Sequence, residues 1–161
     1  MKLRIAFGQP ALPGKFLTMA SVAVASFALV AGMANAGDKE SVEYRQNQMS
    51  VLGGHMGSLV AIVKGEVPFA GDLAYHANGL AAAAPHVIPV FKTEAMTDKS
   101  EALPDIWKDW PTFEKAALNL EKTAKALAAA AADGDQAAIG AALGDVGKSC
   151  KGCHDDFVKE H

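Results

Sequence analysis

The sequence predicts an all-α protein, an antiparallel four-helix bundle formed by one domain. Apolar residues recur at helical spacing in four segments, and no segment shows the alternating pattern of a strand. Mostly short links join the four segments. Four helices of roughly 20 residues with such links are typical of an antiparallel bundle.

The first predicted helix covers about residues 41–64. An apolar stripe follows one face of it at alternating steps of three and four, and Arg45 completes the row. The stripe consists of Val42, Met49, Leu52, Met56, Leu59 and Val63. Gly65 is the expected C-cap. A second helix is predicted over about residues 71–91, where Pro85 and Pro89 predict a kink or an early end.

The longest connection is predicted over residues 92–110. Three of its residues are expected to pack against the bundle: Pro104, Trp107 and Trp110. Pro111 suits the first turn of a third helix, because its missing N–H would be unpaired there anyway. That helix should end at Asp133-Gly134, and Asp135 can cap the fourth helix. The apolar stripe of the fourth helix consists of Ile139, Leu143, Val146, Cys150, Cys153 and Phe157.

Residues 1–36 have the pattern of a cleaved signal peptide. Lys2, Arg4 and Lys15 give a positive start, and an apolar run covers residues 16–33. Ala34-Asn35-Ala36 fits the small-x-small cleavage site, so we expect the cut before Gly37. The alternative is a permanent membrane anchor, but the apolar run barely reaches the length that spans a bilayer. The predicted location is therefore the periplasm.

Residues 37–161 are then the working domain, of a normal size for one core. This part contains all 18 acidic residues and 12 of the 15 basic ones, which gives a net charge of −6. Nucleic acids and anionic membranes require a basic face. We therefore predict no nucleic-acid partner, and no membrane partner after signal cleavage.

The chemistry of the sequence is concentrated in Cys150-Lys151-Gly152-Cys153-His154, the C-x-x-C-H pattern of c-type haem attachment. On a helix, positions i, i+3 and i+4 share one face. Both thiols can therefore react with the two vinyl groups of one porphyrin, while His154 gives an imidazole nitrogen to the iron. The motif predicts one covalently attached haem c per chain.

Other interpretations of the two cysteines are open. A structural zinc site needs more ligands close by, and no second C-x-x-C exists. A redox dithiol normally sits at a helix N-terminus, whereas this pair lies deep in the predicted fourth helix. A disulfide between the two would close a very small loop and constrain little of the chain. A chance match is the remaining alternative.

With these features, the sequence resembles the cytochrome c′ family, the class II c-type cytochromes, over essentially all of residues 37–161. The resemblance is carried by four stretches: Tyr44-Arg45-Gln46, Val63-Lys64-Gly65, Pro104-Asp105-Ile106-Trp107 and GDVGKSCKGCHDDF at 144–157. It implies that His154 is the axial ligand on the solvent side. It also implies that Arg45 and Gln46 lie beside the haem propionates, and that the protein is a homodimer packed through its first two helices.

The resemblance places Met49 at the distal haem position, where one branch of the family has a methionine ligand and the others have no ligand. Met49 also suits a core position, because methionine is a common gap-filler. Met56 is too far along the helix, whereas Met96, which is in a loop, stays open as an alternative ligand. The family often has a basic residue where this sequence has Val158, a departure that fits electron transfer better than gas handling.

The sequence therefore predicts a periplasmic electron carrier with low-spin iron held by His154 and Met49, which works with redox protein partners and is not an enzyme. The alternative is a five-coordinate cytochrome c′ that binds nitric oxide or carbon monoxide at the distal haem face. The other histidines, His55, His76 and His86, are given no role, because lone histidines are more often surface or core residues than ligands.

Overall fold

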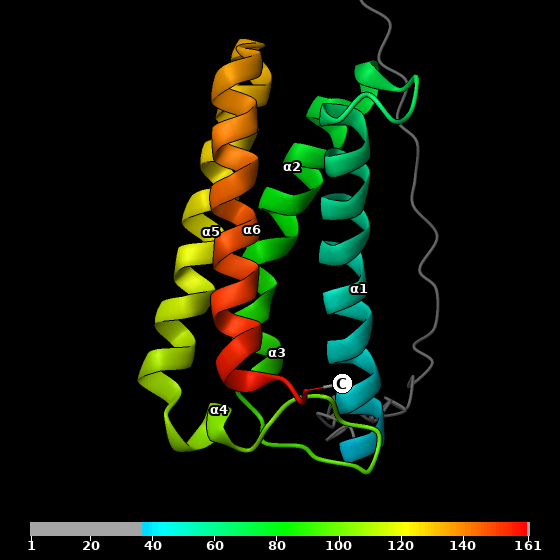
Figure 1. Cartoon of the computed structure of the whole chain (residues 1–161). Helices are drawn as coiled ribbons and strands as arrows, with labels where there is room; N and C mark the ends of the chain where they lie inside the picture. The colour runs from blue at the N-terminus through cyan, green and yellow to red at the C-terminus, as the bar shows by residue number, and fades with distance from the viewer. Residues whose placement is uncertain (1–36, 161) are drawn as a thin grey trace, which may run out of the picture. The chain divides into compact units, whose positions relative to one another are not determined.

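The computed structural model describes residues 37–160, which form a helical bundle. Its helices are α1 (Asp38–Val63), α2 (Leu73–Ala83), α3 (Val87–Phe91), α4 (Asp105–Lys108), α5 (Trp110–Asp133) and α6 (Gln136–Phe157). Two 3₁₀ turns, Ala70–Asp72 and Ala84–His86, flank α2. Figure 1 shows α5 lying along α6, with α1 beside α2. The predicted all-α class is confirmed.

Helix α1 buries the stripe that its sequence predicts. Its buried residues are Val42, Arg45, Leu52, Leu59 and Ile62. The helix ends at Val63 with Lys64 as its C-cap, and Gly65 follows with a left-handed φ of 69°, which favours glycine. There the Gly65 N–H donates to the Ile62 carbonyl at 3.0 Å, and the Glu66 N–H donates to the Ala61 carbonyl at 2.9 Å. The predicted C-cap, Gly65, is therefore the residue that follows the cap.

The second predicted helix is divided near Pro85. Helix α2 ends at Ala83, a 3₁₀ turn containing Pro85 follows, and α3 continues to Phe91. Proline has no N–H to donate to the preceding turn, and its ring crowds the carbonyl there. The early end predicted from the prolines is therefore confirmed.

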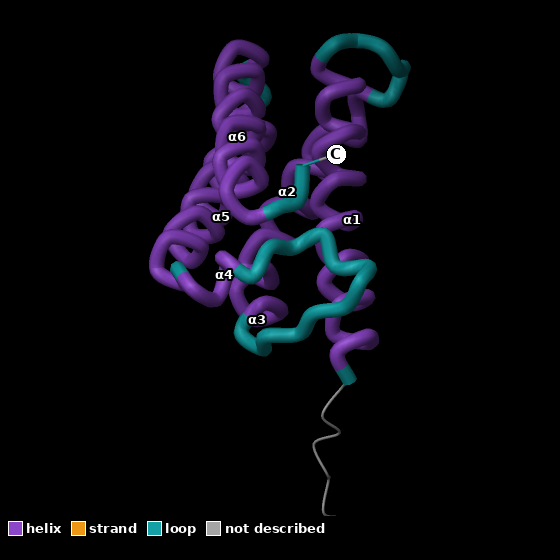
Figure 2. The backbone as a smooth tube through the Cα atoms, turned by 60° about the horizontal axis from the view of Figure 1, so that its bottom comes forward, coloured by secondary structure: helices purple, strands orange, loops and turns teal. Residues whose placement is uncertain are grey.

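The connection over residues 92–104 is held against both ends of the described chain. Figure 2 shows it passing from α3 toward the first turns of α1 and then back to α4. The Leu103 N–H donates to the Phe157 carbonyl and the Lys159 N–H donates to the Glu101 carbonyl, both at 2.9 Å. An isolated antiparallel bridge joins Ala102 to Val158. These backbone bonds close one end of the bundle.

The short helix α4 was not predicted, because its four residues are too few for a periodic pattern. Its Trp107 packs against the core as expected, and the indole N–H donates to the Phe91 carbonyl at 2.8 Å. Trp110, at the start of α5, also packs against the core.

The predicted stop of α5 at Gly134 and the predicted cap of α6 at Asp135 are confirmed, whereas the cap of α5 at Asp109 was not predicted. The Asp109 carboxylate caps α5 by accepting from the Thr112 N–H. Gly134 ends α5 with a left-handed φ of 76°. The Asp135 carboxylate accepts from the N–H groups of Ala137 at 2.9 Å and Ala138 at 3.2 Å, and so begins α6.

The expected signal peptide, residues 1–36, lies outside the described residues. Among residues 37–160, each helix is too short or too polar to cross a bilayer.

Candidate functional site

A cavity of about 590 Å³ lies between α1 and α6, and residues of α2, α3 and α5 complete its walls. Helices α1 and α6 make few direct contacts with each other, which leaves room between them. The volume falls within the roughly 300–1,000 Å³ of ordinary ligand pockets. Most of the lining is apolar, and the cavity is therefore suited to a large apolar ligand.

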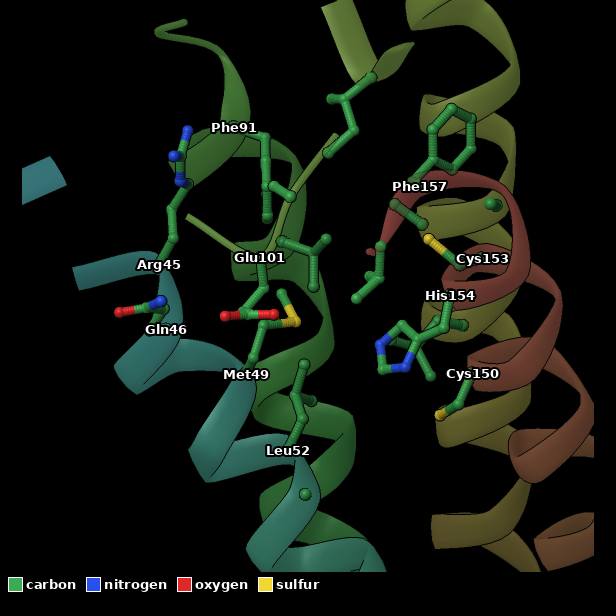
Figure 3. Close-up of a pocket in the computed structure, with 18 of the residues that line it drawn as sticks. Arg45, Gln46, Met49, Leu52, Phe91, Glu101, Cys150, Cys153, His154 and Phe157 are labelled. Carbon is green, nitrogen blue, oxygen red and sulfur yellow. The ribbon is translucent and has the colours of Figure 1, made fainter. Parts of the chain in front are cut away.

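Three residues of the C-x-x-C-H motif line the α6 wall of this cavity. Cys150 and Cys153 are half-buried and His154 is exposed. Figure 3 shows all three side chains extending toward the cavity from successive turns of α6. The helical spacing of the motif therefore brings both thiols and the imidazole to one ligand, as the sequence predicts.

Both thiols are held in their neutral form. Burial raises the pKa of Cys150, and it raises the pKa of Cys153 to about 11, with Cys150 and Asp156 adding to the shift. A reactive dithiol needs a lowered thiol pKa. Among the described residues, no three His, Cys, Asp or Glu side chains are grouped to hold a metal. The site therefore favours neither the redox dithiol nor the structural zinc site.

The opposite wall belongs to α1 and is apolar. Met49, Leu52 and Met56 line it. In Figure 3 the side chains of Met49 and His154 extend toward each other from opposite walls. Met96 is not among the residues that line the cavity.

Arg45 is the buried cation of the cavity, with only 3% of its surface exposed. Its guanidinium carbon lies 5.0 Å from the centroid of the Phe91 ring and 5.3 Å from that of Trp107. Its Nη2 donates to the Ala95 carbonyl, but the buried Nη1 has no hydrogen-bond partner among the described residues. Burial lowers the Arg45 pKa, and the nearby charge of Asp38 opposes that shift.

A buried N–H without an acceptor is costly, so the free Nη1 at this cavity points to a ligand that carries an acceptor. Gln46 also lines the cavity, and its Nε2 donates to the Lys99 carbonyl at 2.8 Å. A haem has an apolar macrocycle, two vinyl groups and two carboxylates. The apolar walls, the two thiols and the Arg45 N–H therefore match the chemistry of a haem.

Some cavity residues were not identified from the sequence. Phe91 lines the cavity and contacts the Arg45 guanidinium, and Glu101 lines the cavity from the irregular connection before α4. Ser149 is buried beside the motif and accepts a hydrogen bond from the Asn119 amide at 3.1 Å. Residues in a connection follow no periodic pattern, so only the fold brings them to the cavity.

The family model described as "Cytochrome C'" matches residues 40–158. A cytochrome c′ from Pararhodospirillum photometricum is 40% identical over 117 residues, which cover 72% of this chain and 94% of that protein. A cytochrome c′ from Halomonas halodenitrificans is 38% identical, with 76% of this chain and 98% of that protein covered.

Solved structures agree with these sequence relatives. The cytochrome c prime from Shewanella frigidimarina has a TM-score of 0.72 and 34% identity, and the match covers 76% of this chain and 97% of that one. A nitric oxide complex of a mutant cytochrome c prime from Alcaligenes xylosoxidans has a TM-score of 0.72 and 31% identity, covering 78% and 98%. The predicted bundle architecture is thereby confirmed.

These relatives correct the function predicted from the sequence. The low-spin electron carrier with His154 and Met49 as ligands is wrong, because the matched proteins are cytochromes c′ and solved neighbours include nitric oxide complexes. Met49 is half-buried on the same wall as Met56, where a flexible apolar side chain also serves packing. Helical spacing cannot distinguish this packing role from ligation.

Val158, where the family often has a basic residue, follows the end of α6. It pairs with Ala102 in the backbone bridge and lines the cavity, so its lack of charge reflects its place in the fold. The motif, the cavity and the relatives agree on one cofactor and one family. This chain belongs to the cytochrome c′ family and carries one covalently attached haem.

Proposed function

We propose that this protein binds nitric oxide or carbon monoxide at the haem face that α1 covers, with His154 as the one axial ligand from the chain. The observation that carries the proposal is the structural similarity to nitric oxide complexes of a cytochrome c prime, at 31% identity and TM-scores of 0.71–0.72. The protein is then a binding protein and not an enzyme.

In this proposal the residues of α6 hold the haem. Cys150 and Cys153 supply two thioether links, and His154 supplies an imidazole nitrogen. Arg45 and Gln46 lie at the cavity edge, where the Arg45 Nη1 is free to donate to a propionate. When bound and reduced, the haem would supply an iron that can bind a diatomic gas.

In this proposal the α1 wall contacts the gas and determines which ligands can bind. Met49, Leu52 and Met56 present apolar surface to the cavity, which favours a small neutral ligand over water and anions. Met49 lies opposite His154 and therefore limits the space on that side. Its unbranched side chain can turn aside when a ligand enters.

The absorption spectrum of the purified protein tests this proposal. We expect a high-spin ferric spectrum and ready binding of carbon monoxide after reduction. A low-spin spectrum in both oxidation states, with no uptake of carbon monoxide, would contradict it. A colourless protein, after expression with a haem-attachment system, would overturn the assignment of Cys150, Cys153 and His154.

A Met49→Ala variant should bind carbon monoxide more tightly, by about tenfold, the scale of one apolar contact in a ligand pocket. The reason is the space that the shorter side chain opens opposite His154. Carbon monoxide titration of the reduced protein measures the change. Met96→Ala is the matched control, because Met96 does not line the cavity. Equal affinities for carbon monoxide in the wild type and both variants would show that Met49 does not limit the space for the gas.

We also propose that the protein works in the periplasm as a homodimer, and that a redox protein partner reduces its iron. The signal pattern of residues 1–36 supports the location. The exposed side chains of Tyr44 and Val51 in α1 and of Tyr75 in α2 support a dimer packed through these two helices. Cell fractionation and sedimentation equilibrium of the holoprotein test these two points.

A further inference from the structure

The Arg45 guanidinium lies against two aromatic rings at the haem cavity. Its carbon is 5.0 Å from the ring centroid of Phe91 and 5.3 Å from that of Trp107. Phe91 lines the cavity, whereas Trp107 does not. We propose that Trp107 is a positioning residue, which holds the Arg45 guanidinium at the cavity and thereby raises the reduction potential of the haem.

Trp107 is itself held in a fixed place. Its indole N–H donates to the Phe91 carbonyl at 2.8 Å, and the two ring centroids are 6.5 Å apart. The residue before it, Ile106, is buried in the core and anchors the short helix α4. Among aromatic side chains, the indole ring attracts a cation most strongly. The ends of α3 and α4 therefore present two joined rings to the guanidinium.

The other contacts of Arg45 leave one of its nitrogens for the cavity. Nη2 donates to the Ala95 carbonyl, while the buried Nη1 has no partner among the described residues. Because the guanidinium is planar and rigid, the carbonyl and the two rings together fix the direction of Nη1. An unpaired buried N–H is costly, so a less restrained arginine would turn toward water. The rings oppose that movement and keep the donor ready for a ligand.

The position of this cation affects the redox equilibrium of the haem. The inference rests on the proposed placement of Arg45 beside a haem propionate. Oxidation adds one positive charge to the iron, and a cation held nearby in a water-poor cavity opposes it. The same cation turned into solvent is screened. Asp38, whose charge acts on Arg45, and Glu101, which lines the cavity, are kept in every variant below.

Redox titration of the holoprotein tests the role of Trp107. Arg45→Met should lower the equilibrium constant for haem reduction by about tenfold, the scale of one charge-assisted hydrogen bond. Trp107→Leu should lower it by at least about threefold, the scale of one cation–π contact. Because Trp107 acts through Arg45, adding Trp107→Leu to Arg45→Met should produce no further change.

Trp110→Leu is the matched control. Like Trp107, Trp110 packs against the core and contacts a phenylalanine that lines the cavity; its ring centroid is 5.4 Å from that of Phe113. Of the described aromatic rings, those against the Arg45 guanidinium belong to Phe91 and Trp107. Trp110→Leu should therefore leave the reduction potential unchanged. Trp107→Phe keeps an aromatic face for the cation and should restore most of the wild-type potential.

Stability is measured separately from the potential. Circular dichroism and the haem spectrum establish that each variant is folded. Trp107→Met, whose flexible side chain fills more of the space, replaces Trp107→Leu if the leucine variant does not fold. Both tryptophan positions should lose stability on truncation, but only truncation at Trp107 should change the potential.

Three outcomes would overturn the proposal. An unchanged potential in Trp107→Leu, with a lowered one in Arg45→Met, would exclude Trp107 alone. An equal effect of Trp107→Leu with and without Arg45 would mean that the ring acts by packing. An unchanged potential in Arg45→Met would also overturn the placement of Arg45 beside a propionate. Gas binding at the opposite haem face is tested independently, by carbon monoxide titration.

Discussion

Arg45 combines three features that rarely occur in one side chain. It is buried, it lies between two aromatic rings, and one of its guanidinium nitrogens has no partner among the described residues. Its position in the apolar row of the first helix was predictable, but its neighbours were not. Phe91 and Trp107 come from distant parts of the chain, and only the fold brings them to Arg45.

Replacement of this cation should destabilise the holoprotein. In Arg45→Met the Ala95 carbonyl loses its donor, and we expect the free energy of unfolding to fall by about 2 kcal/mol, within the range for a buried polar group left unpaired. Chemical denaturation followed by helical circular dichroism measures it. Lys39→Met removes an exposed cation of the same helix and is the control. Equal losses in the two variants would contradict a special role for Arg45.

His55 makes stability depend on pH. Its pKa in the folded protein lies below the ordinary value, first because of burial and second because of His76. The unfolded chain therefore binds more protons as the pH falls below about 6.5, and stability is lost in that direction. We expect a shallower fall between about pH 7 and pH 5 in His55→Asn, measured by denaturation at each pH. The same pH dependence in His55→Asn and in the wild type would exclude this origin.

At the scale of the elements, the helices were predictable because their signals are local. Apolar spacing, glycine and proline positions and capping carboxylates all act within a few residues, and α1, α5 and α6 follow them closely. The connection before α4 had no such signal. Its position depends on hydrogen bonds to Phe157 and Lys159, more than fifty residues away along the chain.

The cap of α6 matters because this helix carries the haem-binding motif. Asp135→Ala removes the acceptor of two N–H groups, and we expect a loss of about 1 kcal/mol of folding free energy, which is typical for such a cap. Asp133→Ala, at the exposed end of α5, should have little effect. Thermal and chemical unfolding of the two variants compare them. No difference between them would mean that the cap is not stabilising.

At the scale of the whole molecule, the sequence was enough to identify the haem-attachment residues of α6. It was not enough to assign the role of Met49 on the α1 wall of the cavity. Cys150, Cys153 and His154 form a local five-residue pattern that is specific to haem attachment. Met49 belongs to no such pattern, and its helical spacing is that of any core residue. The same limit applies to His55 and His76: they look isolated in the sequence, and only the packing of α1 on α2 makes them a pair.

The two walls of the large cavity come from helices near opposite ends of the described chain, α1 and α6. During synthesis, the thiols that accept the haem are therefore made well after the α1 wall that faces them. A nascent chain that ends before α6 has the apolar wall from α1 but no second wall to complete the cavity. Docking of α6 and attachment of the haem should accordingly be coupled events, because neither wall encloses the haem alone.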